Sequence, residues 1–536
     1  MTKHRLAILA LAGCSSHTSL PGGDDGGPAD AAAPTRSLQS VKTVVVIFAE
    51  NRGFDNLYGS FPGANGLPVN GSYVPQLDRD FSRLAKLPQA WNGVTAAGFA
   101  PAITQAMSDN LANAPYSLMT TYTGFDTSTI TRDLYHRFFE NQMQIDGGAN
   151  DMFAAYADSG GLVMGHYDGQ GMGLWALAKQ FVLADNFFMG AFGGSFLNHQ
   201  YLICACAPEY PDADTDPAKP TIATLEVDTA GNVLPQLRLA ATSPASALDG
   251  PPAFVSSGNL VPKNYFGDAT FHAVNTMQPP FQPSANAPAA TDATRLYADR
   301  AKATTLPPQR AMTIGDQLEA KGVSWAWYSG AWRATLATAS GDRMFPPTTT
   351  PGSAPNFQFH HQPFNYYQAF DPQTGAAARQ QHLKDYADLT ADIAAGTLPE
   401  VVFYKPEGDL NQHPGYASIA AGDKHLGELV AALQASPQYA NMIIVITYDE
   451  NGGWWDHVAP PLGDLVGPGT RIPAIIVSPF AKAGFVDHTP YDTGSILRFL
   501  DRRFDLAPLP GTIARDAALV ANGGVAMGDL TNALSF

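Results

Sequence analysis

The chain has 536 residues, and its 31 basic and 48 acidic side chains give a formal charge of −17 at pH 7. Lysine and arginine form no basic run, so this balance argues against a nucleic-acid partner. A chain of this length could hold three domains, but α/β enzymes are often larger as one unit, and we find no clean internal linker and no repeat.

The N-terminus has the pattern of a secretory signal: residues 1–5 include Lys3 and Arg5, residues 6–12 are apolar, and Gly13 and Cys14 follow. Residues 11–14 resemble the lipobox of bacterial lipoproteins, in which the cysteine becomes the lipidated N-terminus. The alternative is an ordinary cleaved signal in which Cys14 has no such role. We predict an exported protein that is periplasmic, anchored to the outer membrane or secreted. Its membrane contact would be limited to a lipid on Cys14.

The composition divides the rest of the chain. Residues 15–40 are rich in Gly, Ser, Ala, Asp and Pro, which predicts a disordered tether after a signal peptide at 1–14. We predict one domain over 41–510 and a C-terminal tail over 511–536. Residues 208–310 are crowded with Pro, Ala, Thr and Asn, and we expect them to form an irregular insertion over the core.

Short apolar runs alternate with helical patterns between residues 41 and 510. The predicted strands are 44–48, 181–184, 323–328, 401–404, 442–447 and 474–477. The predicted helices include 313–321, 382–395, 424–433 and 493–500. This alternation predicts an α/β fold with a mostly parallel central sheet flanked by helices.

Two of the predicted strands end in oxygen-bearing side chains. Glu50 and Asn51 follow the run at 44–48, and Asp449 and Glu450 follow the run at 442–447. Continuous apolar runs are typical of parallel strands covered on both faces, and ligands bind at the carboxyl ends of such strands. The four residues could therefore converge on one divalent cation, and oxygen ligands favour Mg²⁺, Ca²⁺ or Mn²⁺. The alternative is a pair of surface turns after core strands.

The segment after residue 192 predicts an anion site. Gly193 and Gly194 precede Ser195, which we expect to be the first residue of a helix. Glycines allow the backbone to approach an anion closely, and a helix N-terminus offers free N–H groups. A serine there, beside a cation, could attack a phosphoryl group, whereas the alternative is a serine that only caps the helix.

Several of the thirteen histidines lie in predicted loops. The candidates among the thirteen are His136, His199, His360, His361, His413, His457 and His488. A lone histidine is more often structural, but histidines near Gly, Pro and Asn at strand ends could donate to phosphoryl oxygens and protonate a leaving group.

Besides Cys14, the chain has only two cysteines, Cys204 and Cys206. A spacing of one intervening residue is unfavourable for a disulfide, and we predict two buried thiols.

Four segments together resemble the bacterial phosphoesterase family that joins phospholipases C and acid phosphatases. They are VVIFAENRGFDNLYG at 45–59, LYHRFFENQMQIDGG at 134–148, NFFMGAFGGSFLNHQYL at 186–202 and ITYDENGGWWDHVAPP at 446–461. The Ser-Phe-Leu-Asn-His segment at 195–199 resembles the AcpA-type acid phosphatases, whereas the phospholipase branch usually has a threonine in a different local sequence. The likeness extends from about residue 41 to residue 500 and is weakest over 208–310.

The resemblance implies an alkaline-phosphatase-like α/β sandwich that binds one divalent metal ion. The implied metal ligands are Glu50, Asn51, Ser195, Asp449 and Glu450. The implied phosphate site is lined by His136, His199, His361 and His413, with Asn198 nearby. The choice between His360 and His361 stays open, and His457 and His488 are candidates for residues behind the site.

The resemblance also implies the activity. We predict an acid phosphatase that hydrolyses phosphomonoesters through the nucleophile Ser195 and a phosphoserine intermediate. The alternatives are a phospholipase C that acts on phosphodiester headgroups and a non-catalytic anion-binding lipoprotein. Four histidines around a dianionic phosphate predict an optimum of kcat/KM below about pH 7, because imidazolium binds phosphate better than imidazole does.

Overall fold

We analysed a computed structural model of the protein, which describes residues 36–68, 73–275, 286–337 and 357–536. The predicted signal peptide, Cys14 with its lipobox and the tether up to residue 35 lie outside the described residues. Within these ranges, no helix combines the length and the apolar character needed to cross a membrane.

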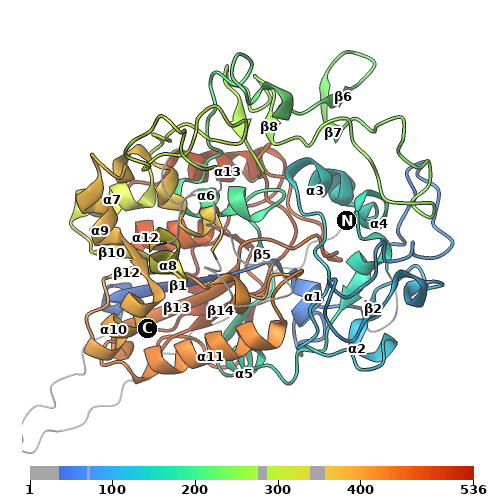
Figure 1. Cartoon of the computed structure of the whole chain (residues 1–536). Helices are drawn as coiled ribbons and strands as arrows, with labels where there is room; N and C mark the ends of the chain where they lie inside the picture. Colours follow the sequence, from blue (N-terminus) through green and yellow to red (C-terminus); the bar gives the residue numbers. More distant parts are fainter. Residues whose placement is uncertain (1–35, 69–72, 276–285, 338–356) are drawn as a thin grey trace, which may run out of the picture. The chain divides into compact units, whose positions relative to one another are not determined.

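An eight-stranded sheet forms the centre of the fold, in the order β11-β10-β12-β1-β13-β14-β4-β15 (Figure 1). The strands are β11 Leu383–Asp385, β10 Trp325–Ser329, β12 Val401–Lys405, β1 Thr43–Ala49, β13 Met442–Tyr448, β14 Ala474–Val477, β4 Val182–Ala184 and β15 Phe485–Asp487. Every neighbouring pair is parallel except the two pairs that β14 makes with β13 and β4. The predicted α/β fold with a mostly parallel sheet is confirmed, and all six predicted strands belong to this sheet.

The register of the central strands determines where the site lies. β1 and β13 are seven residues long, fully buried, and paired from Thr43 with Met442 to Ala49 with Tyr448. On its other side β1 pairs with β12, where Ile47 lies beside Tyr404. Glu50, Asp449 and the last residue of β12 therefore emerge at the same edge of the sheet.

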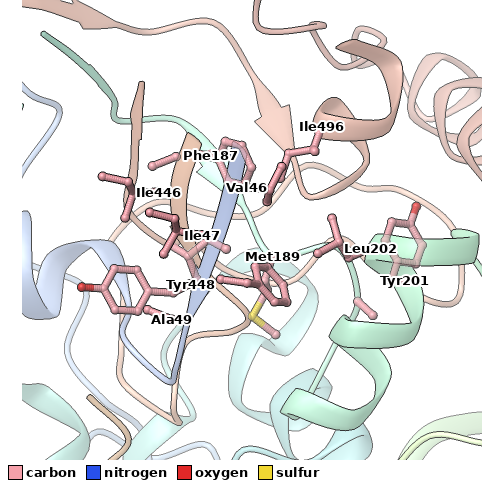
Figure 2. Packing of buried hydrophobic residues seen from close by; sticks show 14 of the residues in the cluster. Val46, Ile47, Ala49, Phe187, Met189, Tyr201, Leu202, Ile446, Tyr448 and Ile496 are labelled. Carbon is pink, nitrogen blue, oxygen red and sulfur yellow. The ribbon is translucent and has the colours of Figure 1, made fainter. Parts of the chain in front are cut away.

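Helices cover the two faces of the sheet (Figure 1). One layer contains α5 Gly173–Gln180, α10 Tyr386–Ala395 and α11 Ile419–Ala435. The other contains α6 Ser195–Cys204, α7 Ile314–Lys321, α12 Gly494–Phe504 and α13 Pro510–Ala521. Figure 2 shows Val46 of β1 on the same side of the sheet as Met189, Leu202 of α6 and Ile496 of α12, whereas Ile47 and Ile446 point to the other side. The ring centroids of Phe48 in β1 and His199 in α6 are 5.0 Å apart, so buried contacts join the central strand to the helix that begins at Ser195.

The remaining elements are short. The helices are α1 Phe54–Tyr58, α2 Leu118–Thr121, α3 Phe138–Ile145, α4 Phe153–Tyr156, α8 Trp332–Ala337 and α9 Ala376–His382. The small strands are β2 Tyr116–Ser117, β3 Gly165–His166, β5 Phe187–Phe188, β6 Leu225–Val227, β7 Val233–Leu237, β8 Leu260–Val261, β9 His272–Ala273 and β16 Tyr491–Asp492.

The predicted helix over 382–395 is wrong in its first part. Helix α9 ends at His382, the next three residues pair with β10 as strand β11, and α10 begins only at Tyr386. Asp385 causes the break, because its side chain accepts a hydrogen bond from the backbone N–H of Ala387 and so caps α10.

Residues 208–310 contain two small antiparallel sheets, β6-β7 and β8-β9, outside the central sheet. Arg79 attaches this segment to the body of the domain. Its guanidinium donates hydrogen bonds to the carbonyl oxygens of Ala155 (3.0 Å), Pro244 (2.6 Å) and Gly250 (2.8 Å). One arginine thus fixes the loop 244–250 against α4.

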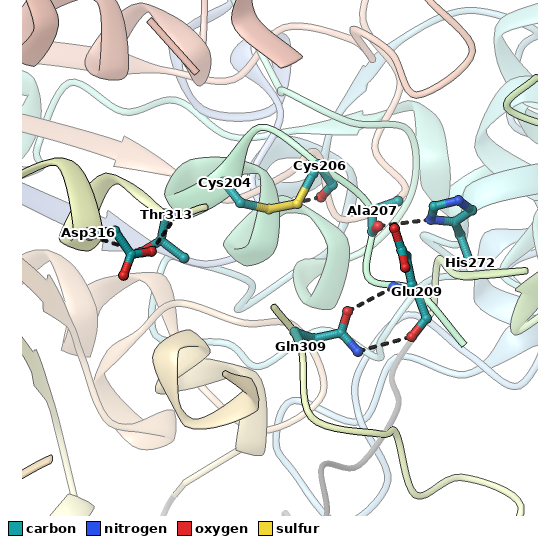
Figure 3. The surroundings of a disulfide bond; sticks show 8 residues. All are labelled: Cys204, Cys206, Ala207, Glu209, His272, Gln309, Thr313 and Asp316. Atoms are coloured by element: carbon teal, nitrogen blue, oxygen red, sulfur yellow. Dashed lines mark hydrogen bonds between the residues drawn. A yellow bond between two sulfur atoms is a disulfide. The ribbon is translucent and has the colours of Figure 1, made fainter. Parts of the chain in front are cut away.

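Cys204 and Cys206 form a disulfide, so the prediction of two buried thiols is wrong (Figure 3). Ala205 adopts a left-handed conformation with φ 50° and ψ 38° at the end of α6. This turn brings the Cα atoms of the two cysteines to 5.1 Å, within the normal range for a disulfide. The carbonyl oxygen of Ala207 then accepts a hydrogen bond from His272 at 2.9 Å.

Candidate functional site

The four predicted ligands at the ends of β1 and β13 are close together and fully buried. Asp449 Oδ1 accepts hydrogen bonds from the backbone N–H groups of Asn51 (3.0 Å) and Glu450 (2.8 Å). Asn51 has a positive φ of 60°, which asparagine tolerates better than most residues. The turn after β1 is therefore tied directly to the turn after β13.

Two carboxylate oxygens at this edge, Asp449 Oδ2 and Glu450 Oε1, have no hydrogen-bond partner among the described residues. A buried polar atom without a partner is costly. Burial raises the pKa of Asp449, against the opposing effect of Lys405. Burial and the neighbouring Asp449 raise the pKa of Glu450 well above its ordinary value. Two buried acids that each have a raised pKa and one unpartnered oxygen fit a site for a hard divalent cation.

Glu50 differs from the two acids of β13, because both of its oxygens are already hydrogen-bonded. Oε1 lies 2.6 Å from His361 Nε2 and 2.9 Å from Lys405 Nζ. Oε2 accepts from Asn411 Nδ2 at 2.9 Å and from the Tyr416 hydroxyl at 3.0 Å. Burial raises the pKa of Glu50, but Lys405 and His361 outweigh it and hold that pKa well below its ordinary value. Glu50 is thus the ionised acid of the group.

Ser195 is the first residue of α6, as predicted from the sequence, and it is buried. Its hydroxyl donates a hydrogen bond to Asn51 Oδ1 at 3.4 Å. The hydroxyl therefore lies at the free N–H end of the helix and contacts the acidic edge, which is the edge of the sheet that carries Glu50, Asn51, Asp449 and Glu450.

The two glycines before Ser195 allow the chain to pack closely. Gly193 has φ 85°, and a Cβ atom there would lie 2.3 Å from the backbone nitrogen of Phe138. A Cβ on Gly194 would lie 2.7 Å from the carbonyl oxygen of His136. Because these glycines have no side chains, the segment 136–138 packs directly against the start of α6. The prediction from the sequence was that the glycines allow an anion to approach.

Asn198 supports this loop from inside the helix. Its Oδ1 accepts from the backbone N–H of Ala191 at 2.9 Å, and its Nδ2 donates to the carbonyl oxygens of Ala191 (3.1 Å), Gly193 (3.4 Å) and Gly194 (3.2 Å). Both ends of the amide are used by the backbone, so Asn198 orients the loop that carries Ser195.

Two of the predicted histidines position neighbouring groups. His136 Nδ1 lies 2.5 Å from the carbonyl oxygen of Leu134 and therefore donates to it, which leaves Nε2 to accept from Asn51 Nδ2 at 3.2 Å. His199 Nδ1 donates to the carbonyl oxygen of Ser195 at 2.7 Å, and its Nε2 has no partner in the described part of the chain. Possible ligand atoms of Glu50, His199 and Asp449 all lie within 4.8 Å of one another.

The adjacent residues His360 and His361 have different surroundings in the structure. His361 is fully buried and hydrogen-bonded to Glu50. His360 lines the cavity described below, and its Nε2 is 3.7 Å from Glu50 Oε1, which is too long for a hydrogen bond. Neither ring nitrogen of His360 has a partner within the described ranges. His360 is therefore the member of the pair that can meet a ligand.

A cavity of about 530 Å³ opens beside Ser195. Its wall includes His136, Arg137, Phe196, Asn259, Asn275, Gln358, His360, His413 and Tyr416. Asn259 and Asn275 belong to the segment 208–310, so that segment forms part of the wall. His413 lies at the cavity with its Nε2 4.0 Å from Glu50 Oε2.

Burial keeps the histidines of the site neutral. It lowers the pKa of His136, His199 and His413, and it lowers the pKa of His361 to about 3. Asp133 and Glu50 partly oppose the effect at His413. In the ligand-free protein these four rings are imidazoles at neutral pH.

His457 and His488 belong to a different cluster. His457 Nδ1 is 2.6 Å from Asp55 Oδ2, and His488 Nδ1 is 2.8 Å from Asp185 Oδ2. The buried guanidinium of Arg471 lies between these acids and contacts Asp55 at 3.1 Å. Arg471 is the cation of this cluster, and no hydrogen bond or ion pair among the described residues joins the cluster to Ser195.

Three polar residues around Glu50 were not predicted: Lys405, Asn411 and Tyr416. Lys405 follows the apolar run 401–404, and the signal was a single charged residue at the end of a buried strand. Asn411 and Tyr416 flank His413 in the sequence. Only the strand order β12-β1-β13 reveals that all three reach Glu50.

A family model and several known proteins are similar to this chain. A model of the phosphoesterase family matches residues 41–507. Phospholipase C A of Mycobacterium tuberculosis strain H37Rv is 23% identical over 532 residues, which cover 93% of this chain and 78% of that protein. The non-hemolytic phospholipase C of Pseudomonas aeruginosa is 28% identical over 180 residues, which cover 28% of this chain and 25% of that protein.

Similar solved structures include a protein of the alkaline phosphatase superfamily from Vibrio parahaemolyticus, with 12% identity and a TM-score of 0.22 over 38% of this chain and 50% of that chain. Another is murine ectonucleotide pyrophosphatase/phosphodiesterase 5, with 11% identity and a TM-score of 0.27 over 63% of this chain and 90% of that chain.

Proposed function

Because the chain belongs to the phosphoesterase family and is a hydrolase of phosphoric esters, we propose that it acts on phosphomonoesters with Ser195 as the nucleophile. One observation carries the proposal. The buried Ser195 hydroxyl, at the N-terminus of α6, donates to Asn51 Oδ1 at 3.4 Å. The backbone N–H of Asn51 in turn donates to Asp449, whose Oδ2 has no hydrogen-bond partner among the described residues. This arrangement supports a nucleophile that meets an anionic substrate next to a cation.

The donor set supports one divalent metal ion. Asn51, Asp449, Glu450 and Ser195 would hold it, with Glu50 as the fifth ligand inferred from the sequence. All the proposed donor atoms are oxygens, which supports Mg²⁺, Ca²⁺ or Mn²⁺. When bound, such an ion would acidify the Ser195 hydroxyl and offset negative charge on the phosphoryl group.

The side chains around Ser195 have separate roles in this proposal. The Ser195 oxygen forms a bond to phosphorus as the ester oxygen leaves with a proton, and water then hydrolyses the phosphoserine. His360 and His413 face the cavity. His360 donates to the phosphoryl oxygens or to the leaving group, and His413, whose Nδ1 donates to the carbonyl oxygen of Pro414, donates from Nε2 when it is protonated. His136 orients the nucleophile through Asn51. Asn198 orients it through the loop 191–194.

A phospholipase C is the second candidate, and the names of the relatives favour it. The proteins from Mycobacterium tuberculosis and Pseudomonas aeruginosa are both named phospholipases C. The serine in the Ser-Phe-Leu-Asn-His segment supports the phosphatase instead. A non-catalytic anion-binding protein is not supported, since the family is one of hydrolases.

A substrate panel tests the proposal. We would assay the purified, metal-loaded protein with p-nitrophenyl phosphate, bis-p-nitrophenyl phosphate and phosphatidylcholine vesicles, using Ser195→Ala as the control for contaminating activity. We expect kcat/KM for the monoester to exceed that for the diester at least about tenfold, because the dianion of a monoester would interact more strongly with the proposed metal ion than the monoanion of a diester would. Faster hydrolysis of phosphatidylcholine than of the monoester would instead assign the chain to the phospholipases C.

A further inference from the structure

Lys405 is a fully buried lysine among the carboxylates of the site. Its ammonium is 2.9 Å from Glu50 Oε1, 3.7 Å from Asp449 Oδ2 and 3.4 Å from the carbonyl oxygen of Ala49. The side chain reaches this position because Lys405 is the last residue of β12, which lies beside β1 in the sheet. A lysine is almost never fully buried unless its charge is paired.

The charges of the site show what this lysine does. Glu50, Asp449 and Glu450 are three fully buried acids, and without a nearby cation their mutual repulsion would disfavour the ionised state. Lys405 is the lysine in contact with two of them. Lys405 offsets one negative charge from the side of β12. Asp449 Oδ2 and Glu450 Oε1 still have no hydrogen-bond partners among the described residues.

We propose that Lys405 is a resident cation of the metal centre, which holds Glu50 in place before the metal binds and weakens the affinity of the centre for a divalent ion. This inference rests on the metal site proposed above. Lys405 does not touch the substrate cavity, so it is a positioning residue and acts through Glu50 and Asp449.

The two parts of the proposal follow from the same contacts. An ammonium 2.9 Å from Glu50 Oε1 stabilises the ionised acid in the metal-free protein. The same positive charge, 3.7 Å from Asp449 Oδ2, repels any divalent ion that binds that oxygen. The centre is thereby preformed, but it binds its ion more weakly than the same three carboxylates would without the positive charge of Lys405.

The proposal is tested by the affinity of the Lys405→Met variant for a divalent metal ion. If Lys405 had only a structural role, its replacement would not strengthen metal binding. We would strip the protein with chelator and measure the dissociation constants for Mn²⁺ and Mg²⁺ by calorimetry. We expect Lys405→Met to bind at least about tenfold more tightly than the wild type and to have a lower thermal midpoint without metal, whereas Lys405→Arg should restore the weaker affinity. Equal or weaker metal binding by Lys405→Met would overturn the proposal.

Lys384→Met is the matched control. Lys384 lies on β11 and pairs with Asp392 at 3.3 Å, away from the acids of the site. Its loss removes the same charge from the protein, so we expect the metal dissociation constants to stay within about twofold of the wild type. A tighter affinity in this variant as well would mean that net charge, and not the position of Lys405, sets the affinity, and would overturn the proposal.

A second comparison is needed if Lys405→Met does not fold because the charge of Glu50 has lost its partner. Glu50→Gln and Glu50→Gln/Lys405→Met differ only in the lysine and contain no unpaired Glu50. We expect the double variant to bind Mn²⁺ more tightly than Glu50→Gln by at least about tenfold. An unchanged affinity would contradict the proposal.

The same titrations separate this inference from the proposed function. If the wild type binds neither ion and the chelated enzyme keeps full activity, the metal centre itself is wrong. If the wild type binds metal and the lysine variants bind it no more tightly, only the role of Lys405 is wrong.

Discussion

Asp449 has one satisfied and one unpartnered oxygen, and this asymmetry makes it the most informative acid of the site. Oδ1 accepts from two backbone N–H groups and orders the turns after β1 and β13. Oδ2 has no hydrogen-bond partner within the described residues. An asparagine in this position could still accept both backbone hydrogen bonds while removing the charge.

We therefore predict that Asp449→Asn folds but loses metal and activity together, with metal affinity reduced by about a hundredfold or more. Metal content by mass spectrometry and monoester turnover, measured on the same samples, check this. A metal-free wild-type sample that retains full turnover would contradict the metal requirement.

The histidines supply a second prediction at the residue scale. Burial lowers the pKa of His136, His199 and His413, so these rings gain a proton only below the ordinary range of histidine. Charge-assisted binding of phosphate by the cavity-lining His413 should then appear only on the acidic side of about pH 6.5.

We expect kcat/KM for a monoester to reach its maximum below about pH 7. The increase in kcat/KM at acidic pH should be smaller in His413→Gln. The pH profiles of the two proteins, recorded at saturating metal, provide the measurement. A profile that climbs steadily to alkaline pH would show that deprotonation of Ser195 dominates.

Most residues around the acidic edge could be predicted, and the exceptions have a common cause. Glu50, Asn51, Asp449 and Glu450 were found because two apolar strands end in polar side chains. Lys405, Asn411 and Tyr416 were missed because their approach to Glu50 depends on β12 lying beside β1. His360 and His361 could not be separated, since adjacent side chains diverge according to a local turn, here the 3-10 helix Phe359–His361.

At the scale of elements, the start of α6 depends on a close contact with the segment 136–138. Gly193 combines a positive φ of 85° with a space in which a Cβ atom would lie 2.3 Å from the nitrogen of Phe138. Any side chain there must displace either that segment or Ser195.

We predict that Gly193→Ala lowers stability by at least about 2 kcal/mol and reduces monoester kcat at least about tenfold. Thermal unfolding and steady-state kinetics are the measurements. Gly427→Ala in α11 is the control, because a Cβ there meets nothing within 4 Å and should leave kcat unchanged while stabilising the helix by about 0.5–1 kcal/mol. Unchanged stability and kcat in Gly193→Ala would refute the packing argument.

Element boundaries were predicted well where apolar runs were long. Strands β1 and β13 could be read from the sequence because they are covered on both faces. Strands β11 and β15, with three residues each, give no such run. The boundary between β11 and α10 is set by the cap at Asp385, and the disulfide of Cys204 and Cys206 depends on the left-handed Ala205, so neither follows from hydrophobic periodicity.

At the scale of the whole molecule, stability depends on pH through carboxyl groups outside the acidic edge. Glu140 in α3 is buried, and its Oε2 has no hydrogen-bond partner in the described structure. Burial raises the pKa of Glu140 to about 7. A carboxyl group whose pKa is raised on folding stabilises the protein at low pH, and that contribution is lost as the pH rises through about 7.

We predict that Glu140→Gln, which mimics the protonated acid, is more stable than the wild type at pH 8 by up to about 3 kcal/mol and differs little from it at pH 5. Thermal midpoints at the two pH values test this, with the exposed Glu428→Gln as the control. A constant difference between Glu140→Gln and the wild type at both pH values would show that Glu140 does not titrate as stated.

The central claim is that Ser195 carries the phosphoryl group during turnover. The most direct measurement is acid quenching of the metal-loaded enzyme during hydrolysis of p-nitrophenyl phosphate, followed by peptide mass spectrometry. We predict one added phosphoryl group on the peptide that contains Ser195, and neither that adduct nor monoester turnover in Ser195→Ala. Turnover in Ser195→Ala close to that of the wild type, or a phosphoryl group on another residue, would contradict the account.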